Sequence, residues 1–167
     1  MKQTFKKQTF NANIFEIIRV LSKRSTCLRR QISSVITKEN NIISTGYNGA
    51  PSGCVHCVVV GCLRQKLNIP SGERMELCRA GHAEVNAIVQ AAKHGISTNG
   101  ASIYTQSIPC GYCAKAIINS GITDVYYLKD DYPDKLGIQL IEESGKVTLH
   151  QIVLKEKLKE DFEYRLP

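Results

Sequence analysis

The sequence predicts an α/β domain, a three-layer α/β/α sandwich around a mixed five-stranded sheet. Two strand-like segments near the N-terminus are joined by a short polar turn, which indicates an antiparallel hairpin. From residue 82 onward, strand-like and helix-like segments alternate, which indicates right-handed crossovers and a parallel half-sheet. The helices between these strands are rich in apolar and small residues, as expected of helices that cover a sheet.

The elements follow in order along the chain. Apolar residues recur at helical spacing over about 12–24, a basic segment that Asn11 or Asn13 can cap. Residues 31–37 and 41–45 form the predicted hairpin. The later predicted elements are a helix at 82–94, a strand at 101–105, a helix at 111–120, a strand at 123–128, a helix at about 133–143 and a strand at about 147–153. The charged tail, about 155–167, is predicted to be a surface helix.

Length and composition predict a single domain over residues 1–167. With 43% hydrophobic and 22% charged residues, the chain has a globular composition, which excludes a disordered or fibrous protein. Its apolar runs are far shorter than the roughly 20 residues of a membrane span. The basic N-terminus lacks the apolar segment of a secretory signal. We therefore expect a cytoplasmic protein.

The net charge of +7 is concentrated in residues 1–40, which contain nine Lys or Arg and two Glu. Residues 41–167 contain thirteen charges of each sign and are neutral. Such a basic end can contact phosphate, nucleic acid or a membrane surface, or it can be a solvated basic helix.

Two short motifs predict a catalytic zinc site. His82-Ala-Glu84 and Pro109-Cys110-Gly-Tyr-Cys113 stand at the starts of two predicted buried helices. One imidazole and two thiolates leave the fourth zinc position open for water, as in catalytic sites. Glu84, two residues after the histidine, can take a proton from that water and deliver protons to a ring nitrogen and a leaving amine. This combination is typical of zinc nucleobase deaminases.

Two alternatives remain open at this point. A fourth protein ligand would make the site a non-catalytic zinc module, in which Glu84 only caps a helix. The basic end is also compatible with a deaminase that acts on cytosine or adenine in a nucleic acid.

The sequence resembles the deoxycytidylate (dCMP) deaminase family of the cytidine deaminase-like superfamily, over roughly residues 15–150. The matching segments are Ser22-Lys-Arg-Ser-Thr-Cys-Leu-Arg-Arg-Gln31, Ile43-Ser-Thr-Gly-Tyr-Asn-Gly-Ala-Pro-Ser-Gly53, Gly72-Glu-Arg74, Cys78-Arg-Ala-Gly-His-Ala-Glu-Val-Asn-Ala-Ile88, Pro109-Cys110 with Cys113-Ala-Lys115, and Asn119-Ser-Gly-Ile122. The Gly-Tyr-Asn-Gly loop separates this family from tRNA adenosine and riboflavin deaminases, so an activity on nucleic acid is disfavoured.

The resemblance implies hydrolytic deamination of dCMP to dUMP and ammonia, which supplies dUMP for thymidylate synthesis. It implies that His82, Cys110 and Cys113 hold zinc and that Glu84 transfers protons. Asn48 matches a residue that contacts the deoxyribose, and Tyr132 matches, across a one-residue gap, an aromatic residue near the base. The family also implies a cooperative homohexamer, activated by dCTP and inhibited by dTTP through the loop Gly46, Tyr47, Asn48 and Gly49.

Residues 46–81 are rich in glycine and proline and contain four cysteines, so a loop of this length would need a metal or another constraint to pin it. Some family members have a second, structural zinc in this region. We expect Cys27, Cys57, Cys62 and Cys78 to hold it, with His56 or Cys54 as substitutes. The alternative is a set of buried free cysteines.

Three arginines flank the first strand and are candidates to bind the substrate phosphate: Arg24, Arg29 and Arg30. Two positions depart from the family pattern. Ser33 replaces a glycine and is expected to narrow the nucleotide site. Gln106 begins the segment that usually reads Thr-x-Ser, so a polar contact to the base or to a neighbouring loop is expected to differ.

Overall fold

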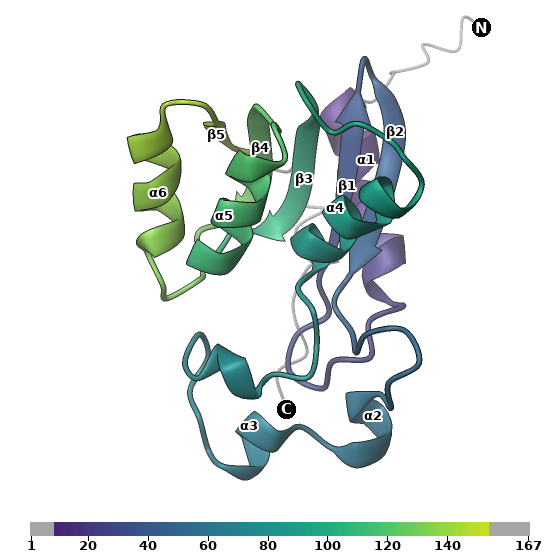
Figure 1. Cartoon of the computed structure of the whole chain (residues 1–167), viewed down its shortest axis with the longest axis vertical. Helices are drawn as coiled ribbons and strands as arrows, with labels where there is room; N and C mark the ends of the chain where they lie inside the picture. Colours follow the sequence, from purple (N-terminus) through teal and green to yellow (C-terminus); the bar gives the residue numbers. More distant parts are fainter. Residues whose placement is uncertain (1–8, 154–167) are drawn as a thin grey trace, which may run out of the picture.

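Five strands form one mixed sheet, in the order β2-β1-β3-β4-β5, in the computed structural model of the chain, which describes residues 9–153 (Figure 1). The strands are β1 (Ser33–Lys38), β2 (Asn41–Tyr47), β3 (Ser102–Ser107), β4 (Asp124–Lys129) and β5 (Thr148–Gln151). β1 pairs antiparallel with both β2 and β3, whereas β3, β4 and β5 are parallel. The predicted hairpin and parallel half-sheet are confirmed.

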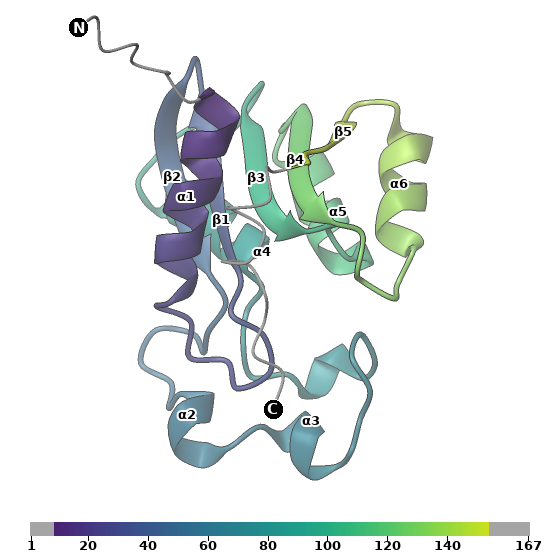
Figure 2. The same ribbon diagram turned by 180° about the vertical axis from the view of Figure 1, so that it is seen from behind.

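Helices cover both faces of the sheet, as predicted for a three-layer sandwich. α1 (Phe10–Ser22) lies on one face of the sheet (Figure 2). There its isoleucines and Phe15 pack with Val35 and Tyr104. The other face carries α4 (Ala83–Lys93), α5 (Gly111–Asn119) and α6 (Leu136–Ser144). There, small residues such as Ala87 and Ala114 let the helices approach Ile103 and Val125 of the sheet closely.

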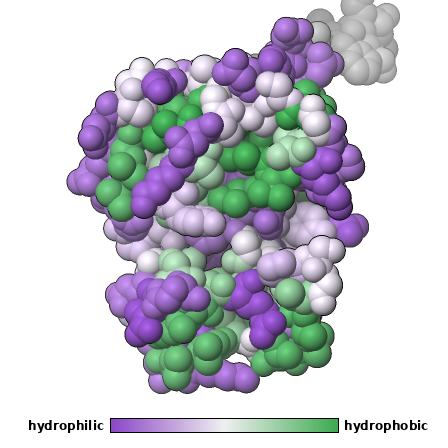
Figure 3. All heavy atoms as spheres, viewed as in Figure 1, coloured by the Kyte–Doolittle hydropathy of each residue, from purple (hydrophilic) through white to green (hydrophobic). Residues whose placement is uncertain are grey.

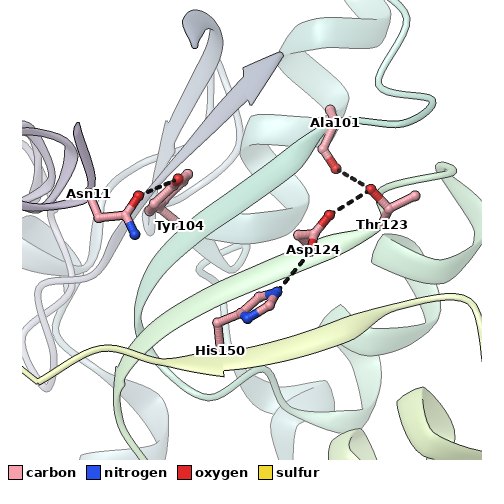
Figure 4. A network of polar contacts seen from close by, with 6 residues as sticks. All are labelled: Asn11, Ala101, Tyr104, Thr123, Asp124 and His150. Carbon is pink, nitrogen blue, oxygen red and sulfur yellow. Dashed lines mark hydrogen bonds and ion pairs between the residues drawn. The ribbon is translucent and has the colours of Figure 1, made fainter. Parts of the chain in front are cut away.

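The structure corrects the predicted start of the first helix. α1 begins at Phe10 because the Thr9 side chain accepts a hydrogen bond from the backbone N–H of Ala12 (3.3 Å). The predicted caps, Asn11 and Asn13, lie inside the helix, where Asn11 Oδ1 instead accepts a hydrogen bond from the Tyr104 hydroxyl (2.9 Å; Figure 4). The tail predicted as a surface helix, about 155–167, lies outside the described residues.

An aromatic ladder crosses the parallel half of the sheet. Tyr104 stacks on Tyr126, and Tyr126 stacks on His150, with centroid distances of 4.5 Å in both pairs. This stacking follows from the register, which places the three residues side by side on β3, β4 and β5. His150 is held at the far end by an ion pair with Asp124 (2.8 Å), and Thr123 donates to the same carboxylate group (Figure 4). The ladder therefore joins α1 to the outermost strand.

Residues 48–81, which follow β2, form a separate segment beyond one end of the sheet (Figure 1). The segment contains the short helices α2 (Cys57–Val60) and α3 (Leu63–Lys66) and the 3₁₀ helix η1 (Met75–Leu77). Exposed valines and leucines gather on α2 and α3, with Val59 75% exposed (Figure 3). Within residues 9–153, none of the helices has the length and apolar character needed to cross a bilayer.

Candidate active site

The two predicted zinc motifs meet at the starts of two neighbouring helices. His82 is the residue that precedes α4, and Cys110 is the residue that precedes α5, while Cys113 lies in the first turn of α5. Backbone N–H groups without helical partners and the partial positive charge of a helix start both stabilise thiolates. The fold therefore brings together one imidazole and two sulfurs in a setting that favours metal ligation.

The geometry of the three side chains fits a tetrahedral zinc ion. His82 Nδ1 lies 3.3 Å from Cys113 Sγ and 3.4 Å from Cys110 Sγ. Zinc bonds of about 2.3 Å to sulfur and about 2.0 Å to nitrogen place tetrahedral N and S ligands about 3.5 Å apart. Within residues 9–153, this is the one group of three or more metal-ligating side chains whose ligand atoms all lie within 4.8 Å of one another.

A hydrogen bond couples the two cysteines and shifts their pKa values in opposite directions. A hydrogen bond from the Cys113 thiol, aided by His82, lowers the pKa of Cys110 to about 4, whereas the same hydrogen bond raises the pKa of Cys113. Burial lowers the pKa of His82, but its hydrogen bond with Cys110 and the charge of Glu84 outweigh burial and raise it. Zinc would replace these protons, since it binds thiolates and neutral imidazole.

Glu84 lies beside the three ligands and is buried, with 6% of its surface exposed. Its Oε1 accepts a hydrogen bond from the Thr105 hydroxyl at 3.4 Å, and its Oε2 lies 3.5 Å from Cys113 Sγ. Burial raises the pKa of this carboxyl above its usual value. A buried carboxyl with a raised pKa, held next to a metal site, is suited to accept and return a proton at neutral pH.

His82, Glu84 and Cys110 line a cavity of about 590 Å³, large enough for a nucleotide-sized ligand. Of the residues predicted to bind substrate, Asn48, Tyr132, Arg29 and Arg30 line this cavity. Arg24 does not line it, because the Arg24 guanidinium lies over the Tyr47 ring, 5.6 Å from its centroid.

The four lining residues differ in the hydrogen-bonding capacity that they have left for a ligand. Asn48 Oδ1 accepts from the Ser25 hydroxyl and the Ile32 backbone N–H, and Asn48 Nδ2 donates to a backbone carbonyl, so one amide proton remains. Arg30 pairs with Asp131 and also donates to Ser107. In contrast, the Nη1 atom of Arg29 is buried without a hydrogen-bond partner among the described residues. Burial raises the pKa of Tyr132, so its hydroxyl stays protonated.

The loop Gly46 to Gly49, predicted to bind effectors, packs against the start of α4. A Cβ atom on Gly46 would lie 2.3 Å from the Ala83 carbonyl oxygen, so only glycine fits there. Asn86 donates a hydrogen bond to the Tyr47 carbonyl (2.8 Å), and Gly49 forms a β-bridge with Gly81. The loop therefore has a structural role next to His82, and Asn48 is its only member that lines the cavity.

The structure also gathers the four cysteines predicted to hold a second zinc. Cys27, Cys57, Cys62 and Cys78 line the same cavity. Burial raises the pKa of Cys57, and the charges of the other three raise it further, which places each of them near Cys57, although no three of these four described sulfurs lie within 4.8 Å of one another. The proposed substitutes differ, because Cys54 and His56 are exposed and do not line the cavity, and His56 Nδ1 instead contacts Thr26 Oγ1 (3.0 Å).

The two departures from the family pattern connect parts of the fold. The expectation that Ser33 narrows the nucleotide site is wrong, since its hydroxyl donates to the Ile18 carbonyl on α1 (2.7 Å). For Gln106, the expected change was in a contact either to the base or to a neighbouring loop, and the structure shows contacts to the loop and the start of β1. Gln106 Oε1 accepts from the Ser33 backbone N–H (2.7 Å) and its Nε2 donates to the Gln31 carbonyl.

Two residues of the site were missed by the sequence analysis. Thr105, in the interior of β3, donates to Glu84, and Arg64, on α3, is buried in the cavity wall. The alternation of side chains along β3 places Thr105 on the face that α4 covers, and a polar residue on a buried face was the available signal. The burial of Arg64 has no local signal.

Comparison with known proteins agrees with this geometry. The model of the family "Cytidine and deoxycytidylate deaminase zinc-binding region" matches residues 9–129. The chain belongs to this family. It is 39% identical to the ComE operon protein 2 of Bacillus subtilis (strain 168) over 139 residues, which make up 83% of this chain and 69% of that protein.

Two further relatives connect this deaminase family member to deoxycytidylate deaminases. It is 31% identical to the deoxycytidylate deaminase of Schizosaccharomyces pombe, over 88% of this chain and 45% of that protein, so the chain spans less than half of that relative. The crystal structure of a dCMP deaminase from the cyanophage S-TIM5 in complex with dCMP and dUMP has a TM-score of 0.72 and 25% identity. That alignment covers 89% of this chain and all of the phage chain.

Proposed function

We propose that this deaminase converts dCMP to dUMP and ammonia by hydrolysis. The observation that supports this function most strongly is the buried Glu84 carboxyl beside the His82, Cys110 and Cys113 ligand set, in a cavity with cationic side chains in its wall. A purely structural zinc site has no use for a buried carboxyl at this place. The names of the relatives favour deoxycytidylate as the substrate.

Each residue of the site has a distinct role in the proposed reaction. His82, Cys110 and Cys113 would hold a zinc ion, and this ion would supply a water activated for attack at neutral pH. Glu84 takes one proton from this water and passes it to N3 of the cytosine as oxygen adds to C4. Glu84 then transfers the second proton to the amino group, the C4–N bond breaks, and ammonia leaves a C4 carbonyl. Thr105 holds the carboxyl in place through its hydroxyl.

Four further side chains are proposed to position the nucleotide. The remaining amide proton of Asn48 is available to the deoxyribose, and Tyr132 borders the space for the base. Arg29 and Arg30 are proposed to contact the 5′-phosphate. Arg29 is the stronger candidate, since Arg30 already pairs with Asp131.

Arg29→Ala is expected to raise the KM for dCMP by about 10- to 100-fold with little change in kcat, because a charge-assisted hydrogen bond contributes about 1.5–3 kcal/mol. Steady-state kinetics measure the effect. Arg24→Ala is the matched control, since it removes the same charge from a side chain outside the cavity. Equal effects of the two substitutions would mean that Arg29 does not contact the phosphate.

We propose that Cys27, Cys57, Cys62 and Cys78 bind a second, structural zinc that pins residues 46–81. The proposal is supported by four cysteines that line one cavity, three of them in a segment with little regular structure and Cys27 from outside it. Cys57→Ser is expected to reduce the zinc content from two ions per chain to one and to lower the thermal midpoint, whereas Cys54→Ser changes neither. Elemental analysis gives the count, and one zinc in the unmodified chain would exclude the second site.

The assembly and regulation of the enzyme are proposed from the resemblance to its family. We propose a cytoplasmic homohexamer that dCTP activates and dTTP inhibits through Gly46, Tyr47, Asn48 and Gly49. The contact of this loop with the start of α4, next to His82, gives an effector a route to the zinc ligands. Light scattering measures the mass, and the same assay with each effector measures the response.

An ammonia-release assay over several substrates tests the proposed function. The zinc-loaded chain is expected to release ammonia from dCMP and to form an equal amount of dUMP. Cytidine, dCTP and a single-stranded oligonucleotide are the comparison substrates. Faster deamination of the oligonucleotide than of dCMP would favour the nucleic-acid activity instead.

A further inference from the structure

Three cationic side chains in the cavity wall, Arg64, Lys66 and Arg79, have no role in the mechanism above, and only Arg64 is buried. Arg64, on the four-residue helix α3, lines the cavity together with His82 and Glu84 and is only 5% exposed. Its Nη2 donates to the Pro70 carbonyl at 2.8 Å. Its Nε is buried with no hydrogen-bond partner among residues 9–153. The guanidinium therefore retains hydrogen-bond donors that the described part of the chain does not use.

A buried guanidinium without a counter-charge is energetically costly, because it has lost water and gained no anion. The ion pairs within residues 9–153 do not include Arg64. Glu76 also lines the cavity, and its hydrogen bond with Arg74 lowers its pKa, with a smaller contribution from the Arg64 charge. The Glu76 carboxylate is exposed, however, and forms its ion pair with Arg74. An anionic ligand in the cavity would supply the missing charge.

The charge of a nucleotide phosphate calls for more than one cation. A phosphate monoester carries a charge of about −1.5 to −2 at pH 7. Arg30 pairs with Asp131, so Arg29 offers one positive charge from its side of the cavity. Arg64 offers a second in the same cavity. The positive charge of Arg64 also acts on Tyr132, which lines the same cavity. It partly offsets the rise in the pKa of Tyr132 that burial causes.

We propose that Arg64 binds the 5′-phosphate of the nucleotide together with Arg29, and that it makes the site select nucleotides over nucleosides. This inference rests on the proposed deamination of dCMP. With deoxycytidine in the cavity, the guanidinium would stay buried without an anion. A site rejects a ligand that lacks the group it is built to bind, because the buried polar side chain of the site is then left unpaired.

Binding of dCMP and of deoxycytidine by Arg64→Met, measured calorimetrically in a Glu84→Gln background, tests the inference without turnover. The affinity for dCMP is expected to fall by about 10- to 100-fold, on the scale of a charge-assisted hydrogen bond, while the affinity for deoxycytidine stays the same. Lys38→Met is the matched control. It removes a charge outside the cavity, whose Nζ donates to the Asn99 carbonyl (2.8 Å), and it is expected to change dCMP binding less than about threefold.

Equal losses for dCMP and deoxycytidine would show that Arg64 only holds its loop through Pro70. An unchanged dCMP affinity, or an equal effect of Lys38→Met, would also overturn the inference. If Arg64→Met does not fold, Arg64→Lys keeps the charge and loses the planar fork, and it is expected to weaken dCMP binding alone. An unmodified chain that binds dCMP through Arg64 but deaminates neither compound would refute the proposed function and leave this inference standing.

Discussion

Glu84→Gln is expected to bind zinc and dCMP as the unmodified chain does and to lose turnover by several orders of magnitude. The amide has nearly the same shape as the carboxyl but cannot accept the proton of the attacking water. One general acid–base step contributes about 10²- to 10⁴-fold, and Glu84 serves in more than one step of the proposed mechanism. Pre-steady-state and steady-state release of dUMP measure turnover, and calorimetry measures dCMP binding.

Glu76→Gln is the matched control for this prediction. Glu76 lines the same cavity, but its carboxylate is exposed and pairs with Arg74. This variant is expected to keep turnover within a few-fold of the unmodified chain. A Glu84→Gln variant with comparable turnover would mean that another group transfers the protons.

Cys110→Ser is expected to lose the catalytic zinc and, with it, detectable deamination. A serine hydroxyl is not deprotonated at neutral pH, so the site keeps the imidazole of His82 and one sulfur as its strong ligands. Without the metal, the water that attacks C4 returns to its bulk pKa of about 15.7, far above the value of about 7 that zinc confers. Elemental analysis is expected to show one zinc fewer per chain.

Cys54→Ser controls for the loss of a sulfur, because Cys54 is exposed and lies outside the cavity. It is expected to keep both the zinc content and the turnover. Addition of zinc to metal-depleted unmodified chain is expected to restore activity. Full activity in Cys110→Ser would rule out a role for this sulfur in holding the catalytic metal.

The layers of the fold could be predicted because strand and helix periodicities alternate clearly after residue 82. The zinc motifs are local as well, since their spacing places His82, Cys110 and Cys113 at helix starts whatever lies around them. The first helix was shifted by two residues because three neighbouring polar residues can cap it. Thr9 caps the helix, while the Asn11 side chain contacts Tyr104 on the sheet.

The remaining features depend on long-range contacts and could not be predicted from local patterns. Four-residue helices such as α2 and α3 are too short to show a period. Arg64 has the local sequence of an exposed basic residue, and its burial results from the way residues 46–81 fold over the cavity. Ser33 contacts α1 rather than the nucleotide site because Ile18 lies directly across from it.

The most direct test of the account is a crystal structure of the zinc-loaded chain with anomalous diffraction measured at the zinc edge. We expect a zinc ion bound by His82 Nδ1, Cys110 Sγ and Cys113 Sγ, with a non-protein atom as its fourth ligand within hydrogen-bond distance of the Glu84 carboxyl. A fourth protein side chain on that zinc, or a Glu84 carboxyl turned away from the open position, would contradict a hydrolytic deaminase.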